Sequence, residues 1–296
     1  METAEGGVRV GAVLAAYNRK DLTLACLRSL RAQRAEGMTL DTFVLDDASS
    51  DGTGEAIAER FPEAVLLRGN GQFYWNEGMR AAFAAAIDRD YDYYLWMNDD
   101  TALDDGALAR LLDAERRLRE QGETLAIVVG TTRHPRTGEL TYGGKVRPSR
   151  WRPLRWKLVE PGDAPRECET MNGNTVLIPR GVVQRVGNID PAFVQQMGDY
   201  DYGLRARAAG CSVWVAPGTI GTCASHPPRR PGERPFLQEW RQLWSVKELT
   251  PRAWAVFARR WGGRLWPLYW LSPYVRRGVM LLGERTRVRR TSASTP

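Results

Sequence analysis

The stretch VRVGAVLAAYNRK, residues 8–20, gives the first clear indication of the fold of this protein. Its first part is almost entirely apolar, which predicts a mostly buried strand that ends near Tyr17. Residues 21–33 follow it with apolar side chains at helical spacing, so an amphipathic helix is expected next. A buried strand that leads directly into such a helix indicates an α/β protein.

The same alternation of strands and helices continues to residue 97. It predicts strands at 42–45, 64–67 and 93–97 and helices at 55–60 and 77–87. Strands and helices that alternate in this way form a parallel sheet with helices on both faces. Ligands of such sheets bind beyond the carboxyl ends of the strands, near the point where the strand order reverses. A ligand site is therefore expected in the loops that follow the strands, at 15–19, 46–53, 68–76 and 98–101.

The second half of the chain is less regular and becomes rich in Pro, Arg and Trp after residue 226. Before that point the pattern predicts helices at 103–118, 181–186 and 200–209 and strands at 125–129, 175–178 and 212–215. Beyond it, helices are expected near 237–247, 251–261 and 273–285. We therefore expect two parts, a domain at 1–226 and a helical extension at 227–296.

Length and composition exclude several classes of protein. The chain has 296 residues, 43% of them hydrophobic and 26% charged, which rules out a disordered or fibrous protein. Its four cysteines share no metal-ligand spacing and are too few for a disulfide framework, so reduced thiols are expected. No apolar run is long enough to cross a membrane, and no secretory signal is visible at the start. These features predict a cytoplasmic protein.

Charge is distributed unevenly along the chain. Residues 1–226 carry 27 basic and 31 acidic side chains, whereas residues 227–296 carry 15 basic and 4 acidic ones. Such a basic segment suits an anionic partner, which can be a membrane surface, a nucleic acid or an acidic substrate. A solvated positive surface without a partner is the alternative.

Two neighbouring carboxylates follow the predicted strand at 93–97. Asn98, Asp99 and Asp100 lie where side chains of a parallel sheet can point into the ligand crevice. Paired carboxylates there suit a hard divalent cation whose other ligands are phosphates and water. The alternative is that Asp100 or Thr101 caps the helix that follows.

Three further acidic or imidazole sites carry candidate chemistry. Asp199 and Asp201 begin a predicted helix, where one of them could act as a general base if it faces the crevice. Alternatively, they stabilise the helix dipole and Asp201 pairs with Arg205. Asp46 and its neighbour end the second strand and could bind a nucleotide base or ribose, or cap the turn. His226 follows the last strand and would suit Mn²⁺ better than Mg²⁺.

The order of these motifs is more specific than any one of them. The chain reads AAYNR, LDDASSDGT, GNGQFYWNEG, MNDDT and MGDYDYGLRARAAG, followed by a histidine. This order resembles the family 2 glycosyltransferases, especially their rhamnosyl- and galactofuranosyl-transferase-like members, over about residues 8–226. The resemblance implies a GT-A fold, which is a Rossmann-like α/β fold with a mainly parallel mixed sheet flanked by helices. It places the nucleotide site in the N-terminal half of the domain and the acceptor site in its C-terminal half.

The resemblance also implies roles for individual residues. Asp199 matches the catalytic base, with Asp201 as its supporting carboxylate. Asp100 and His226 match metal ligands. Binding of the nucleotide sugar is implied for Ala16, Tyr17, Asn18, Arg19, Asp46, Asn70, Gly71, Trp75, Asn76, Asn98 and Asp99.

The chain departs from the family pattern at three places. Asn98 stands at the first DxD position, where its amide can bind ribose but is a poorer metal ligand. Gly198 replaces the usual Glu before Asp199, so that site has lost one carboxylate. The aromatic run at 73–75 replaces small polar residues and could form an apolar wall for the methyl group of a deoxy sugar.

These observations predict an inverting glycosyltransferase (EC 2.4) that moves a hexosyl or deoxyhexosyl group from a nucleotide-diphosphate sugar. A divalent metal, Mg²⁺ or Mn²⁺, would assist the reaction, and the acceptor would be a hydroxyl of a saccharide, a lipid-linked sugar or a small natural product. One alternative is a non-catalytic nucleotide- or membrane-binding protein on the same fold. Another is a nucleotidyltransferase, although the loop at 15–20 is a poor triphosphate loop.

The C-terminal segment mixes Trp and Tyr with Arg between residues 251 and 285. This mixture is typical of segments at a membrane–water interface, so a peripheral contact with the inner face of the membrane is one expectation. The alternative is that the aromatic side chains pack a helical cap onto the domain. No nucleic acid partner is expected.

Overall fold

The computed structural model describes residues 7–33, 37–224 and 250–292. Three sequence-based expectations fall outside these ranges: the helix at 237–247, the boundary at 226/227 and the metal ligand His226.

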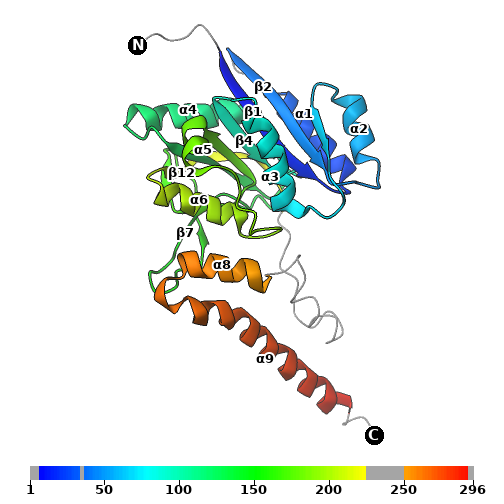
Figure 1. Ribbon diagram of the computed structural model, residues 1–296, viewed down its shortest axis with the longest axis vertical. Coiled ribbons are helices and arrows are strands. Elements are labelled where there is room, and N and C mark those ends of the chain that lie inside the picture. Colours follow the sequence, from blue (N-terminus) through cyan, green and yellow to red (C-terminus); the bar gives the residue numbers. More distant parts are fainter. Residues whose placement is uncertain (1–6, 34–36, 225–249, 293–296) are drawn as a thin grey trace.

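One mixed sheet runs through the body of the protein (Figure 1). Its first half is parallel, in the order β3-β2-β1-β4. These strands are β1 Val8–Ala16, β2 Met38–Asp46, β3 Val65–Arg68 and β4 Tyr93–Met97. The chain adds β2 and β3 on one side of β1 and then places β4 on the other side. The strand order therefore reverses between β1 and β4, which is where a sheet of this kind binds its ligand.

The second half of the sheet is mixed. It continues from β4 with β11 Thr175–Pro179, β6 Ala126–Arg133, β12 Ser212–Thr222 and β5 Ala102–Leu103. β11 is antiparallel to both of its neighbours, and β9 Arg166–Cys168 pairs antiparallel with β12. A small second sheet contains β10 Thr170–Met171, β7 Gly144–Val146 and β8 Lys157–Leu158. The strands between 144 and 171 were not predicted, because two or three residues are too short to show a periodicity of two.

Helices cover both faces of the large sheet, as the alternation in the sequence predicts. On one face lie α1 Lys20–Arg31, α2 Thr53–Arg60 and α4 Ala107–Glu120. On the other face lie α3 Tyr74–Ile87, α5 Arg180–Val186 and α6 Gly198–Ala208. Alternate residues of β1 divide between the two cores, since Val10, Ala12 and Leu14 contact the first group and Val13 the second. The expected Rossmann-like α/β fold is confirmed.

The expected helix at 103–118 begins four residues too early. Leu103 lies in β5 and pairs with Gly221 of β12, and α4 begins at Ala107 after Gly106. Gly106 has φ +68°, a conformation that glycine adopts without strain. The start of the expected helix is therefore part of a strand, because a pairing with a distant strand outweighs a local pattern that also suits a helix.

In the described part of the chain after residue 250, two α-helices lie beyond the sheet domain. α8 Pro251–Trp261 and α9 Trp266–Ser292 pack against each other, and α9 leads away from the body to the C-terminus (Figure 1). Trp254 and Phe257 of α8 are buried together with Phe193 and Leu204 of the sheet domain. Part of the aromatic residues of the extension therefore packs a helical cap onto the domain. This packing is one of the two arrangements that the sequence left open. No helix within the described ranges is long and apolar enough to cross a membrane.

Candidate active site

A pocket lies at the reversal point of the strand order, beside the carboxyl ends of β1 and β4. Its volume is about 500 Å³, which is within the range of small-molecule sites. The described residues that line it come from the end of β1, from the loops after the first four strands, from the first turn of α3 and from one later loop. They are Ala15, Ala16, Tyr17, Arg19, Asp47, Gly71, Tyr74, Trp75, Asp99 and Gln195.

Two carboxylates after β4 converge on one guanidinium group. Nη1 of Arg19 lies 3.2 Å from Oδ1 of Asp99 and 2.9 Å from Oδ2 of Asp100. Both carboxylates are largely buried, and desolvation raises the pKa of Asp99 to about 7 although Arg19 acts in the opposite direction. Arg19 thus places one positive charge between the two carboxylates at this end of the pocket.

This convergence fits a divalent cation that is shared with a substrate. No group of three His, Cys, Asp or Glu residues suited to metal binding exists in the described part of the chain. However, Asp99 and Asp100 direct two carboxylate oxygens at a single point, which now holds the Arg19 nitrogen. A hard cation such as Mg²⁺ needs only one or two carboxylates when phosphates and water complete its shell. The donor set therefore fits such a cation, provided that Arg19 moves aside.

Trp75 forms a fixed wall of the pocket. Its indole Nε1 donates a 2.8 Å hydrogen bond to Oδ1 of Asn98, and its backbone N–H donates to Oε1 of Gln195. A Cβ at Gly173 would lie 2.3 Å from the indole ring, so only glycine allows the ring this position. Asn98 is thus occupied with Trp75 and does not line the pocket.

The two neighbouring aspartates after β2 have different surroundings. Asp46 is fully buried and pairs with Arg68 at 2.7 Å. Asp47 lines the pocket and accepts hydrogen bonds from the backbone N–H groups of Gly71 (2.8 Å) and Phe73 (2.9 Å). The residue that faces the ligand space is therefore Asp47, whereas the resemblance assigns this role to Asp46.

Three polar residues of the expected nucleotide site lie around the pocket without lining it. Oδ1 of Asn18 accepts a 2.7 Å hydrogen bond from the backbone N–H of Ser50, which joins the loops after β1 and β2. Asn70 accepts a hydrogen bond from Gln72 within its own loop. Asn76 is almost completely buried in α3. Asn18 and Asn70 thus form hydrogen bonds within the loops of the site, whereas Asn76 lies in the helix beside them.

The position of Asn76 explains the missing glutamate before Asp199. A Cβ at Gly198 would lie 2.2 Å from Oδ1 of Asn76, so any side chain there would displace the buried amide. The preceding residue, Met197, has φ +70°, which is unfavourable for a residue other than glycine. Such strain is often retained at functional sites.

Asp199 lies in the first turn of α6, and a Cβ at Gly173 would lie 3.2 Å from its Cβ as well as 2.3 Å from the ring of Trp75. Its Oδ2 accepts a 2.9 Å hydrogen bond from the backbone N–H of Gly173, and Oδ1 accepts one from Tyr200. Desolvation raises the pKa of Asp199, although these two N–H groups and the charge of Lys145 act in the opposite direction. A carboxylate that is fixed in position and has a raised pKa is suited to accept a proton.

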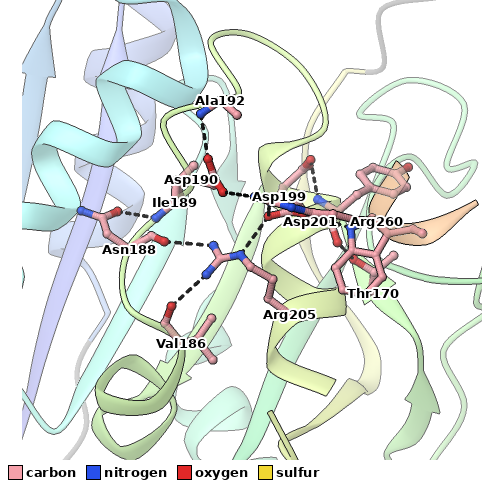
Figure 2. Close-up of polar contacts among 12 residues, drawn as sticks. Thr170, Val186, Asn188, Ile189, Asp190, Ala192, Asp199, Asp201, Arg205 and Arg260 are labelled. Carbon is pink, nitrogen blue, oxygen red and sulfur yellow. Dashed lines mark hydrogen bonds and ion pairs between the residues drawn. The ribbon is translucent and has the colours of Figure 1, made fainter. Parts of the chain in front are cut away.

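Asp201 is the centre of a buried polar network (Figure 2). Its carboxylate has no exposed surface and pairs with Arg205 at 2.8 Å and with Arg260 at 3.1 Å. Trp261 Nε1 donates a third contact at 3.0 Å, and Arg260 also pairs with Asp190. Asp201 therefore connects α6 to α8, and the pairing with Arg205 is the structural alternative that the sequence offered. No part of it is available to touch a substrate.

Replacing Asp201 by asparagine is expected to lower the free energy of unfolding by about 3 kcal/mol, because two guanidinium groups lose a buried partner. Chemical denaturation measures the effect. Asp190→Asn is the matched control, since it removes only the partly exposed ion pair with Arg260 and should cost about 1 kcal/mol or less. Equal losses in the two variants would contradict the central role of Asp201.

Two residues of the site carry no signal in the sequence, whereas Tyr74, which lines the pocket with φ +51°, belongs to the aromatic run at 73–75. Gln195 lines the pocket but belongs to no sequence motif. Cys223 donates from Sγ to Oδ1 of Asp100 at 3.2 Å, although cysteine spacing gave no reason to expect it there. These residues reach the site through long-range packing.

The fold and the pocket define the class of this protein: a Rossmann-like α/β protein with a ligand pocket at the reversal of its strand order. A family model described as Glycosyl transferase family 2 matches residues 12–168, more than half of the chain. The chain belongs to this family. No curated protein sequence matches it significantly.

Solved structures of glycosyltransferases have the same fold. GalNAc-T7 with UDP, GalNAc and Mn²⁺ has a TM-score of 0.55 and 13% identity over 72% of this chain and 43% of its own. TarS of S. aureus, residues 1–349, has a TM-score of 0.52 and 11% identity over 73% of this chain and 60% of its own.

The mannosyltransferase of Pyrobaculum calidifontis with GDP-Man and Mn²⁺ has a TM-score of 0.53 and 16% identity over 99% of this chain and 77% of its own. This chain thus spans less than two thirds of the first two structures. At these identities the likeness shows the fold alone, which is the expected GT-A fold.

Proposed function

We propose that this protein is an inverting glycosyltransferase that moves a sugar from a nucleotide-diphosphate donor to an acceptor hydroxyl. The observation that carries the proposal is that a charged cluster and a fixed carboxylate both lie close to Trp75, which lines the pocket. Arg19, Asp99 and Asp100 form the cluster, and Asp199 lies beside Gly173, where a Cβ would also meet the indole ring of Trp75. The structural neighbours with bound UDP, GDP-Man and Mn²⁺ support the choice of donor.

Asp199 is the group we assign as general base. An alcohol is too weak an acid to lose its proton in advance, so the carboxylate takes the proton while the oxygen attacks the anomeric carbon. The bond from that carbon to the diphosphate breaks on the opposite face, and the diphosphate leaves with the electron pair. The hydrogen bonds from Gly173 and Tyr200 hold the carboxylate in place for this step.

Asp99 and Asp100 would hold the divalent cation, which when bound would neutralise charge on the leaving diphosphate. Arg19 would then be released from the two carboxylates. Its planar guanidinium suits the oxygens of a diphosphate, to which it can donate two parallel hydrogen bonds. His226 is a third ligand, which we propose from the family pattern.

Trp75 and Tyr74 support a donor with an apolar edge, since both aromatic side chains line the pocket. The methyl group of a 6-deoxyhexose would lie favourably against such a surface. We therefore include rhamnosyl transfer in the proposal and galactofuranosyl transfer as its family alternative. We also assign catalysis to residues 1–226 and a supporting role to the extension at 227–296.

The reaction is tested by incubating the full chain with a panel of nucleotide sugars, Mn²⁺ and simple acceptors. Release of the nucleoside diphosphate is the expected product. Binding of the donor without turnover by the wild type would indicate the non-catalytic alternative. Release of pyrophosphate from a nucleoside triphosphate would indicate a nucleotidyltransferase.

A peripheral contact with an anionic bilayer is a second proposal, which rests on the outer face of α9. Leu268, Leu271, Val275 and Val279 are exposed and recur at helical spacing. Trp270, on the opposite side of the helix, packs toward α8. An exposed apolar row on a segment of high positive charge suits the surface of an anionic membrane.

The triple change Leu271→Ser, Val275→Ser and Val279→Ser is expected to abolish co-sedimentation of the full chain with anionic vesicles at low salt. Each change removes an apolar side chain that would enter the interface. Leu22→Ser is the matched control, because Leu22 is equally exposed on α1 but lies far along the chain from α9. Undiminished binding of the triple variant would reject the assigned surface.

A further inference from the structure

A second cavity lies between the loop at 152–156 and the C-terminal helices. Its volume is about 710 Å³, and it is larger than the pocket at the ends of β1 and β4. We refer to it as the C-terminal groove. One wall belongs to the sheet domain and the other to α8 and α9, so the groove exists only because the extension is packed onto the domain.

The polar part of the C-terminal groove is cationic. Arg152, Arg155 and Arg276 line it, and no carboxylate is among its described lining residues. None of the three guanidinium groups forms an ion pair or a side-chain hydrogen bond with another described residue. By contrast, Arg147 of the neighbouring strand region pairs with Glu169, and Arg260 of α8 pairs with two aspartates. Three unbalanced arginines around one space suit the oxygens of a phosphate group.

The rest of the C-terminal groove is apolar. Leu154, Trp156, Trp254 and Leu268 contribute its walls. A free phosphate or a sugar phosphate would leave these side chains without a partner, whereas a hydrocarbon chain would cover them. Leu268 is also the first member of the exposed apolar row of α9, so the apolar wall continues onto the proposed bilayer surface.

One end of the C-terminal groove adjoins the proposed base. Met197 lines the groove and precedes Asp199 by two residues at the start of α6. The ring of Trp156 lies 5.5 Å from that of Tyr200, whose backbone N–H donates to Asp199. A ligand whose anionic group contacts the arginines could therefore extend a sugar toward Asp199.

We propose that the C-terminal groove binds the phosphate and the first carbons of a lipid phosphate, so that the acceptor is a lipid-phosphate-linked saccharide. This inference rests on the proposed function and names its acceptor class. The phosphate lies among the three arginines, and the chain runs along Trp254 and Leu268 toward the apolar row of α9. The membrane contact and the acceptor site are then parts of one continuous surface.

The test uses decyl phosphate below its micellar concentration as the probe, with the full chain and no vesicles. Binding is followed by the fluorescence of the tryptophans, two of which line the groove. Decyl phosphate is expected to bind at least tenfold more tightly than decanol, which lacks the charge, and than inorganic phosphate, which lacks the chain. Equal affinity for decanol would show that the phosphate group does not contribute and would overturn the phosphate site. Equal affinity for inorganic phosphate would show that the hydrocarbon chain does not contribute and would overturn the lipid part of the proposal.

The double variant Arg152→Ala and Arg155→Ala is expected to weaken decyl phosphate binding by about tenfold or more, since charge-assisted hydrogen bonds are lost. Arg150→Ala is the matched control, because Arg150 is exposed on the same loop but stacks on Trp151 and does not line the groove. An equal loss of affinity in the control would show that the effect comes from the net charge of the protein and would reject the site.

Failure of this inference is distinguishable from failure of the proposed function. Nucleotide binding is measured on the same variants, and it should be unchanged because the groove arginines are not among the described residues of the first pocket. If donor turnover occurs but decyl phosphate does not bind, the acceptor class is wrong and the transferase stands. If decyl phosphate binds but no donor is turned over, the transferase proposal fails.

Discussion

Replacing Asp199 by asparagine is expected to lower turnover by a factor of about 10² to 10⁴, the usual contribution of a general base. The amide has the shape of the carboxylate but cannot take a proton from the acceptor. Donor affinity should change little, because Asp199 is not among the described residues that line the pocket. Steady-state release of the nucleoside diphosphate, together with donor binding at equilibrium, separates the two effects.

The pH profile provides a second reading of the same variant. Because burial raises the pKa of Asp199, the base becomes protonated at a higher pH than an ordinary aspartate. As the pH is lowered, the wild-type rate should therefore begin to fall at a higher pH than it would if the base were a solvated carboxyl group. Asp199→Asn should lose this acidic limb, while Asp163→Asn, on an exposed loop residue, should keep it. A variant with the wild-type rate and the wild-type limb would remove Asp199 from the mechanism.

Asp100→Asn is expected to lower metal-stimulated turnover by about 10² to 10³, the usual loss when one electrostatic stabiliser of the leaving group is removed. The wild type should lose activity in a chelator and regain it with Mn²⁺ or Mg²⁺. The fold should persist, because the side chain belongs to a loop at the end of β4. Binding of Mn²⁺ in the presence of the nucleoside diphosphate is measured alongside turnover.

The matched control for the metal is Asp105→Asn, which removes a carboxylate from an exposed position five residues further along the chain. It should leave both metal binding and turnover near the wild-type values. Activity of the wild type that survives the chelator unchanged would exclude a dissociable cation from the reaction.

Within the site, sequence reasoning located the loops better than the side chains. Asp46 and Asp47 are adjacent at the end of β2, and either could have faced the ligand. Packing distinguishes them, since Asp46 is buried in an ion pair with Arg68, whereas Asp47 lines the pocket and accepts a hydrogen bond from the backbone N–H of Gly71. In the same way, Asp201 has the local features of a catalytic residue, but the arrival of Arg260 from α8 makes it a structural one.

Sequence patterns are enough to predict the parallel half of the sheet, the helices on its two faces and the edge of the sheet where the pocket lies. These follow from periodicity within single elements, because a buried strand and an amphipathic helix each impose a pattern over a few residues. Tertiary packing sets which carboxylate faces the pocket, how Trp75 meets Gly173, and where α8 and α9 lie. Those features depend on contacts between residues tens to more than a hundred positions apart, which leave no periodic trace in the chain.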